Sequence, residues 1–143
     1  MTSKADFYVL PSNDPDARGR FLCRLVTKIR ALGHELYIQT ANESEAKRID
    51  QLLWEFQPEA FIPHELLGDK LNSGVQIGWD TQRPEHKDVF VNLNLDIPKD
   101  ALEFDRILEI VIQSEEVLAS TRNNYKSYQA NGISIDMHDM RKR

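Results

Sequence analysis

Residues 7–39 read FYVLPSNDPDARGRFLCRLVTKIRALGHELYIQ and contain a complete strand–helix–strand unit. The apolar run Phe7–Leu10 predicts a buried strand, and the Pro- and Asp-rich residues after it predict a loop. From Arg18 to Leu32 apolar side chains recur at helical spacing, and Gly33 follows as a stop signal. Residues 35–39 predict a second strand. Strands that alternate with helices are typical of a parallel sheet, so this stretch already favours an α/β fold.

The same alternation continues along the chain. Asn42 is placed to cap a second helix, with acidic residues in its first turn and a buried stripe that ends at Phe56. A short extended piece follows at residues 61–64, and strands are predicted at residues 75–79 and 88–95.

The segment from Arg106 to Ile112 suits both a strand and a helix. Its density of β-branched residues favours a strand, and Ser114 then caps a fresh helix that extends toward Gly132. We therefore predict a single three-layer α/β domain over residues 1–135. Its sheet is mostly parallel, with a mononucleotide-binding-like (Rossmann-like) topology, and residues 136–143 form a flexible C-terminal tail.

The composition is that of a globular domain. The chain has 143 residues, a net charge of −5 and one cysteine, which excludes an internal disulfide framework. It has neither a signal-peptide pattern nor an apolar run long enough to span a membrane, so we expect a cytoplasmic protein that contacts no membrane. The acidic balance argues against a broad surface for nucleic-acid phosphates. Residues 119–143 differ, since five Lys/Arg and two Asp/Glu give them a net charge of +3.

The usual nucleotide site of such a sheet is the turn after the first strand. Here that turn contains Asp14 and Asp16, two prolines and no glycine before Gly19. Phosphate binding needs free amide donors and close backbone approach, so this turn disfavours a nucleotide site.

No other pattern in the sequence indicates catalysis. The four histidines, at positions 34, 64, 86 and 138, have no metal-ligand spacing, and we expect His34 and His86 on the solvated surface. Cys23 borders the apolar stripe of the first helix and is expected to be a buried structural residue. We find no nucleophile, base and orienting group together, and therefore expect no catalytic site, no metal and no cofactor.

Two surfaces remain. On the last predicted helix, Arg122 and Lys126 are four residues apart and border an inward stripe that includes Tyr125, with Gln129 next to them. Two basic residues are usually an ordinary solvated face. A basic pair beside an aromatic and aliphatic seam also suits a peptide end that carries a carboxylate and an apolar side chain.

The second surface is on the preceding helix. Trp54 is about 140° from the buried stripe at Ile49, and Pro58, Phe61 and Pro63 follow it closely. Trp54 either folds under the following loop as a satellite core or forms an apolar docking patch with Phe61.

An ordered set of motifs covers nearly the whole chain and resembles the chi subunit of bacterial DNA polymerase III. The motifs are Asp6–Leu10, Leu52–Trp54, Phe61–His64, Val75–Trp79, Asp88–Leu93, Arg122, Tyr125, Lys126, Tyr128 and Gly132. The resemblance implies a non-catalytic clamp-loader accessory subunit on a mononucleotide-binding-like domain.

The resemblance also implies a partner for each surface. Family members bind the acidic C-terminal tail of single-stranded DNA-binding protein, and by position Arg122, Tyr125 and Lys126, with Gln129 beside them, fall in that pocket. Members also pair with the psi subunit of the clamp loader, which implies an interface containing Trp54, Pro58, Phe61, Pro63 and His64. DNA is then contacted indirectly.

Two other functions remain open from the residues themselves. The strand–helix alternation also suits a nucleotide- or phosphate-metabolising enzyme on a Rossmann-like fold. Direct binding of single-stranded DNA could use Trp54, Phe61 and Tyr125 to stack bases, although the acidic charge opposes it.

Overall fold

The computed structural model describes residues 2–56, 65–66 and 74–141. In these residues the α-helices are α1 (Pro15–Ala31), α2 (Glu43–Glu55) and α3 (Glu115–Ala130), with a short 3₁₀ helix η1 (Lys99–Glu103). The strands are β1 (Lys4–Val9), β2 (Leu36–Thr40), β3 (Glu65–Leu66), β4 (Val75–Trp79), β5 (Val89–Asn92), β6 (Arg106–Val111) and β7 (Ser134–Asp139).

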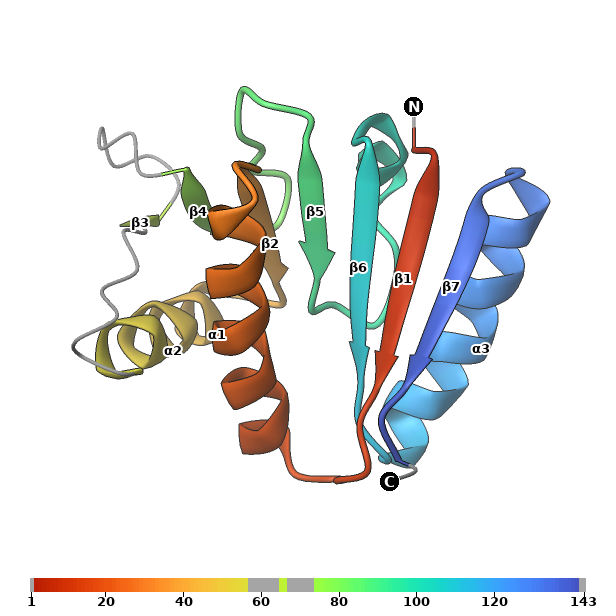
Figure 1. The fold of residues 1–143 in the computed structure, drawn as a ribbon, viewed down its shortest axis with the longest axis horizontal. Coiled ribbons are helices and arrows are strands. Elements are labelled where there is room, and N and C mark those ends of the chain that lie inside the picture. Colours follow the sequence, from red (N-terminus) through yellow and green to blue (C-terminus); the bar gives the residue numbers. More distant parts are fainter. Residues whose placement is uncertain (1, 57–64, 67–73, 142–143) are drawn as a thin grey trace.

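The strands form one sheet in the order β3-β4-β2-β5-β6-β1-β7 (Figure 1). Every pairing between the described strands is parallel. Parallel strands that follow one another in the chain require a crossover connection. This connection contains η1 between β5 and β6 and α3 between β6 and β7, while α1 and α2 lie in other connections. The prediction of a single α/β domain with three layers is confirmed.

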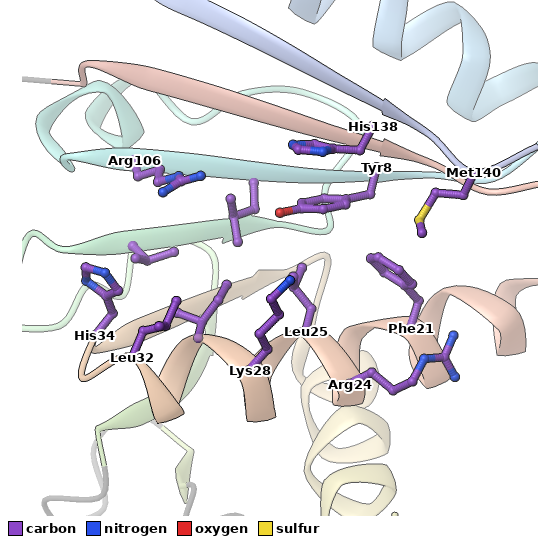
Figure 2. A pocket seen from close by; sticks show the side chains of 13 residues that line it. Tyr8, Phe21, Arg24, Leu25, Lys28, Leu32, His34, Arg106, His138 and Met140 are labelled. Carbon is purple, nitrogen blue, oxygen red and sulfur yellow. The ribbon is translucent and has the colours of Figure 1, made fainter.

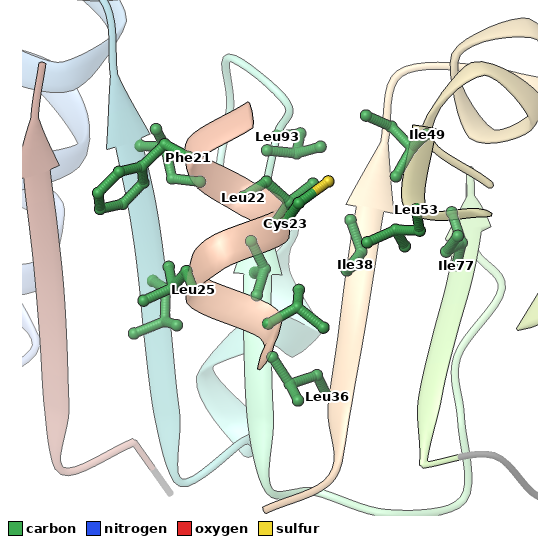
Figure 3. Close-up of a cluster of buried hydrophobic side chains, with 14 of the residues drawn as sticks. Phe21, Leu22, Cys23, Leu25, Leu36, Ile38, Ile49, Leu53, Ile77 and Leu93 are labelled. Carbon is green, nitrogen blue, oxygen red and sulfur yellow. The ribbon is translucent and has the colours of Figure 1, made fainter. Parts of the chain in front are cut away.

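Two apolar cores lie on the two faces of the sheet. On one face α1 and α2 pack against the strands through residues such as Leu22, Leu25 and Leu53 (Figure 3). On the other face α3 and η1 enclose a core that includes Phe7, Ala101, Phe104 and Tyr128. Burial on both faces explains why inner strands such as β5 and β6 consist mainly of apolar residues.

Side-chain caps begin each of the three α-helices. The carboxylate of Asp14 accepts a hydrogen bond from the amide of Asp16 (3.0 Å), and the amide oxygen of Asn42 accepts one from Glu45 (2.9 Å). The hydroxyl of Ser114 accepts from the amide of Val117 (3.2 Å). The caps predicted at Asn42 and Ser114 are confirmed, and so is the strand predicted at residues 106–112.

The C-terminal boundary differs from the predicted one. Residues 134–139 form β7, which pairs with β1 from Lys4↔Ser134 to Val9↔Asp139, so the residues 136–139 of the expected flexible tail belong to the sheet. The segment was misjudged because its sequence, Ser-Ile-Asp-Met-His-Asp, is polar for a strand. An edge strand has one side open to solvent and needs fewer apolar residues than a central one. Residues 61–64, expected as an extended piece, lie outside the described residues.

None of the helices in the described part of the chain is both long enough and apolar enough to cross a membrane.

Candidate protein-docking surfaces

The predicted basic pair lies on the solvent face of α3. Arg122, Lys126 and Gln129 are exposed, whereas Asn124 and Tyr128 on the opposite face are buried. In the described part of the chain no carboxylate forms an ion pair with Arg122 or Lys126. The two cations are therefore available to an anionic partner.

Tyr125 connects this basic pair to the core. It is half-buried, and its ring centroid lies 6.0 Å from that of Phe7 on β1. Phe7 in turn contacts Tyr128 edge-on at 5.7 Å. Tyr125 is thus held by the core on one side and borders the exposed cations on the other.

A shallow hollow extends from Arg122 toward the start of the helix. It is lined by Glu115, Glu116, Leu118, Ala119 and Arg122. At 3.6 residues per turn, Glu115 is on the same stripe as Arg122, two turns before it. The hollow therefore has apolar walls, a cation at one end and carboxylates at the other.

A buried polar cluster fixes α3 to the sheet from inside. The hydroxyl of Tyr128 donates to the carboxylate of Glu109 on β6 (2.6 Å), and the amides of Asn92 and Asn124 donate to the same oxygen (3.2 and 3.4 Å). Asn124 also donates to the carbonyl oxygen of Leu95 (2.9 Å). Burial raises the pKa of Glu109 to about 7, although these hydrogen bonds lower it in part. Our sequence reasoning missed this cluster; the only available signal was a glutamate inside an apolar strand.

Trp54 lies near the C-terminal end of α2, off its buried stripe, as predicted. Ala46, Ile49 and Leu53 are buried, while Trp54 is 46% exposed. The other residues assigned to this surface, Pro58, Phe61, Pro63 and His64, lie outside the described residues.

The structure corrects the expectation for one histidine. His34 is exposed and faces Asp88 at 3.1 Å, as expected for the surface. His86 is half-buried and packs edge-on against Phe104, and burial lowers its pKa. His86 was misjudged because its neighbours in sequence are charged, whereas its ring turns toward the core.

Cys23 is fully buried, as predicted. Burial raises the pKa of its thiol to about 11, so the reactive thiolate is disfavoured.

The fold gathers Asp6, Asp136 and His138 although their sequence spacing is not that of a metal site. The buried Asp6 accepts hydrogen bonds from Arg106 (2.7 Å) and His138 (2.9 Å), and Asp136 pairs with Lys4. Burial by itself raises the pKa of Asp6, but these two hydrogen bonds and the charges of Arg106 and Lys4 together outweigh it and the net pKa is lowered. Arg and Lys already neutralise the carboxylates, which makes the group an internal ion-pair network rather than a cation site.

Comparison with known proteins extends over almost the entire chain. A family model described as "DNA polymerase III chi subunit, HolC" matches residues 1–136. A DNA polymerase III subunit chi from Pseudomonas aeruginosa is 33% identical over 136 residues, covering 95% of this chain and 96% of the relative. The subunit chi of Haemophilus influenzae is 27% identical, covering 98% of this chain and 99% of the relative, and that of Escherichia coli is 26% identical, covering 92% and 95%.

Among solved structures, a crystal structure of T4 UvsW aligns with a TM-score of 0.66 at 8% identity. The alignment covers 97% of this chain but only 41% of UvsW, and at that identity it supports the fold alone. The sequence matches carry the assignment. This chain belongs to the DNA polymerase III chi subunit family, whose members are subunits of a polymerase that acts in DNA replication.

Proposed function

We propose that this chain is a non-catalytic adaptor that binds the acidic C-terminal tail of single-stranded DNA-binding protein and links it to the clamp loader. The observation that carries the proposal is the exposed pair Arg122 and Lys126, which has no ion-pair partner in the described residues and borders the half-buried Tyr125. Gln129 lies one turn further on the same stripe and adds an amide donor.

The proposed binding mechanism is a charge-assisted clamp. Arg122 and Lys126 bind carboxylates of the tail, and Arg122 can do so through two parallel hydrogen bonds. The exposed part of Tyr125 and the apolar wall formed by Leu118 and Ala119 receive an apolar side chain at the end of the tail. Each hydrogen bond to a charged group contributes roughly 1.5–3 kcal/mol before ordering costs, so we expect a dissociation constant on the order of micromolar.

The decisive experiment is calorimetry with a peptide that has the acidic tail sequence. Arg122→Ala should weaken binding at least about tenfold, because it removes a charge-assisted bond. Arg20→Ala is the matched control, since Arg20 is also exposed on a helix but lies on α1. Equal tail affinity in the Arg122 variant and the wild type, with both folded, would exclude this surface.

We further propose that the clamp-loader side, the psi subunit or an equivalent, binds at Trp54 together with Pro58, Phe61, Pro63 and His64. The exposure of Trp54 supports this, because a large aromatic side chain outside the core is a typical interface anchor.

A pull-down from the native cell extract tests this second interface. Trp54→Ala should lose the clamp-loader partner and retain single-stranded DNA-binding protein, since the two surfaces lie on different helices. Arg122→Ala should give the reverse pattern. Loss of both partners in one variant would contradict two independent surfaces.

A further inference from the structure

A pocket of about 440 Å³ lies between α1 and the sheet, away from both surfaces described above (Figure 2). It exists because α1 and α2 cover only part of this face. In Figure 1 the strands β6, β1 and β7 have α3 on their other side, and no helix of the described residues lies directly in front of them. Side chains from α1 and from these strands, together with Val89 of β5, line the resulting space. Its volume is within the range of small-molecule sites.

The inner surface of the pocket is aromatic and aliphatic. The ring of Tyr8 stacks on that of His138, with centroids 4.5 Å apart and planes at 10°, and contacts Phe21 at 5.3 Å. Aliphatic side chains and a methionine complete the apolar lining: Leu25, Ile29, Leu32, Val89, Leu108 and Met140. Flat rings and aliphatic groups of this kind accommodate a planar ligand group.

Basic side chains surround the pocket. Among the described residues Arg24, Lys28, His34, Arg106 and His138 line it, and none of the described lining residues is acidic. Arg106 and His138 already bind Asp6, and His34 faces Asp88. No carboxylate in the described residues pairs with Arg24 or Lys28, so these two keep their charge for a ligand.

The helix that supplies this charge is unusually basic for an acidic protein. Five basic residues and one acidic residue lie in α1, against a net charge of −5 for the whole chain. The basic side chains are also spread along the pocket. Figure 2 shows His34 and Arg106 at one end, Arg24 near Phe21 at the other, and Lys28 between them. This spread fits a ligand with an anionic group and a second polar part better than it fits a fatty acid with a single charged end.

We propose that this pocket binds a nucleotide, with the base against Tyr8 and Phe21 and the phosphate at Lys28 and Arg24. Aromatic side chains stack on bases, and basic side chains bind phosphate. The site differs from the usual nucleotide turn of such sheets, which the side chain of Asp14 already caps. The nucleotide is either free or one residue of a single DNA strand, and the same chemistry serves both.

Titration of the full-length protein with thymidine 5′-monophosphate, followed by NMR or calorimetry, tests the proposal. We expect saturable binding that Lys28→Glu weakens at least about tenfold, because one attraction becomes a repulsion. Arg20→Glu is the matched control, since it makes the same charge change on the same helix at an exposed position that does not line the pocket. Equal losses of affinity in the two variants would show that only the net charge matters, and would contradict binding in this pocket.

Two further ligands test each half of the nucleotide. Thymidine should bind more weakly than the monophosphate because it lacks the anion, and inorganic phosphate more weakly because it lacks the base. If either binds as tightly as the monophosphate, the nucleotide assignment fails. Tyr8→Leu keeps an apolar side chain but removes the ring. It should weaken binding of the monophosphate and leave binding of inorganic phosphate unchanged.

Fluorescence anisotropy with a labelled oligothymidylate separates the two sources. If the oligomer binds more tightly than the monophosphate and Lys28→Glu abolishes this binding, the pocket is a site for single-stranded DNA. If the oligomer binds equally or more weakly, the pocket is a site for the free nucleotide. Arg122→Ala should not change the binding of the monophosphate or the oligomer, and Lys28→Glu should not change the binding of the acidic tail peptide. Failure of this proposal is thereby distinguishable from failure of tail binding.

Discussion

At the scale of single residues, burial determines which ionisable groups make the free energy of unfolding depend on pH. Glu109 is 5% exposed and has three hydrogen-bond donors around one carboxylate oxygen, from Asn92, Asn124 and Tyr128. The sequence reveals an acid within an apolar strand but cannot supply its partners. They lie 15 to 19 residues away on other elements: pairing of β5 with β6 sets Asn92 opposite Glu109, and packing of α3 on the sheet adds Asn124 and Tyr128.

This residue predicts a dependence of stability on pH. The pKa of Glu109 rises from 4.5 to about 7 on folding. Below pH 4.5 the carboxyl keeps its proton in both states. Between pH 4.5 and 7 the unfolded chain releases the proton while the folded chain retains it, so the free energy of unfolding falls, by at most about 3 kcal/mol.

Urea denaturation at pH 5 and pH 8 measures this contribution. Glu109→Gln stays neutral, so its stability relative to the wild type should increase between these two values. Comparison with the wild type cancels the other titrating groups, and the exposed Glu103→Gln serves as control. Parallel pH profiles for Glu109→Gln and the wild type would contradict the raised pKa.

At the scale of elements, periodicity and caps were sufficient for α2 and α3 but not for η1 or the last strand. The buried stripe of α2 and the caps of α2 and α3 follow from local sequence. The polar β7 forms because β1 offers a parallel partner and because Asp6 binds His138 across the pair. That partnership spans more than 130 residues and has no local signature.

Truncation tests the contribution of β7. A chain that ends at Ile133 should lose at least about 2 kcal/mol of stability, since the buried Asp6 loses a hydrogen bond and β1 loses its pairing on one side. A chain that ends at Arg141 retains β7 and should match the full-length protein in urea denaturation. If both truncated chains were equally stable, residues 134–139 would contribute nothing.

At the scale of the whole molecule, the uneven charge distribution separates the proposed functions. The chain is acidic, yet α1 carries a net charge of +4 and the exposed stripe of α3 carries Arg122 and Lys126. The net charge of the C-terminal residues points to α3. The basic character of α1 is harder to recognise in the sequence, because its basic residues are interspersed with the apolar residues of its buried stripe.

Salt dependence is the prediction that belongs to this scale. Binding of the acidic tail peptide should weaken as salt is raised from low to about 0.15 M and beyond, because exposed charges are screened over roughly 8–10 Å. Calorimetry across a salt series measures this. An affinity independent of salt would indicate that apolar contacts alone hold the tail.

The sequence by itself determined the α/β class, the caps of α2 and α3, the buried Cys23, the position of Trp54 off its stripe and the family. These properties depend on neighbours within one or two turns, or on an ordered set of motifs, and both can be recognised in the sequence alone. Only the tertiary structure decided the seventh strand, the burial of His86, the Glu109 cluster and the basic pocket beside α1. Each of these is made by side chains from elements distant in sequence, and their free energies depend on burial and distance, which exist only once the sheet is assembled.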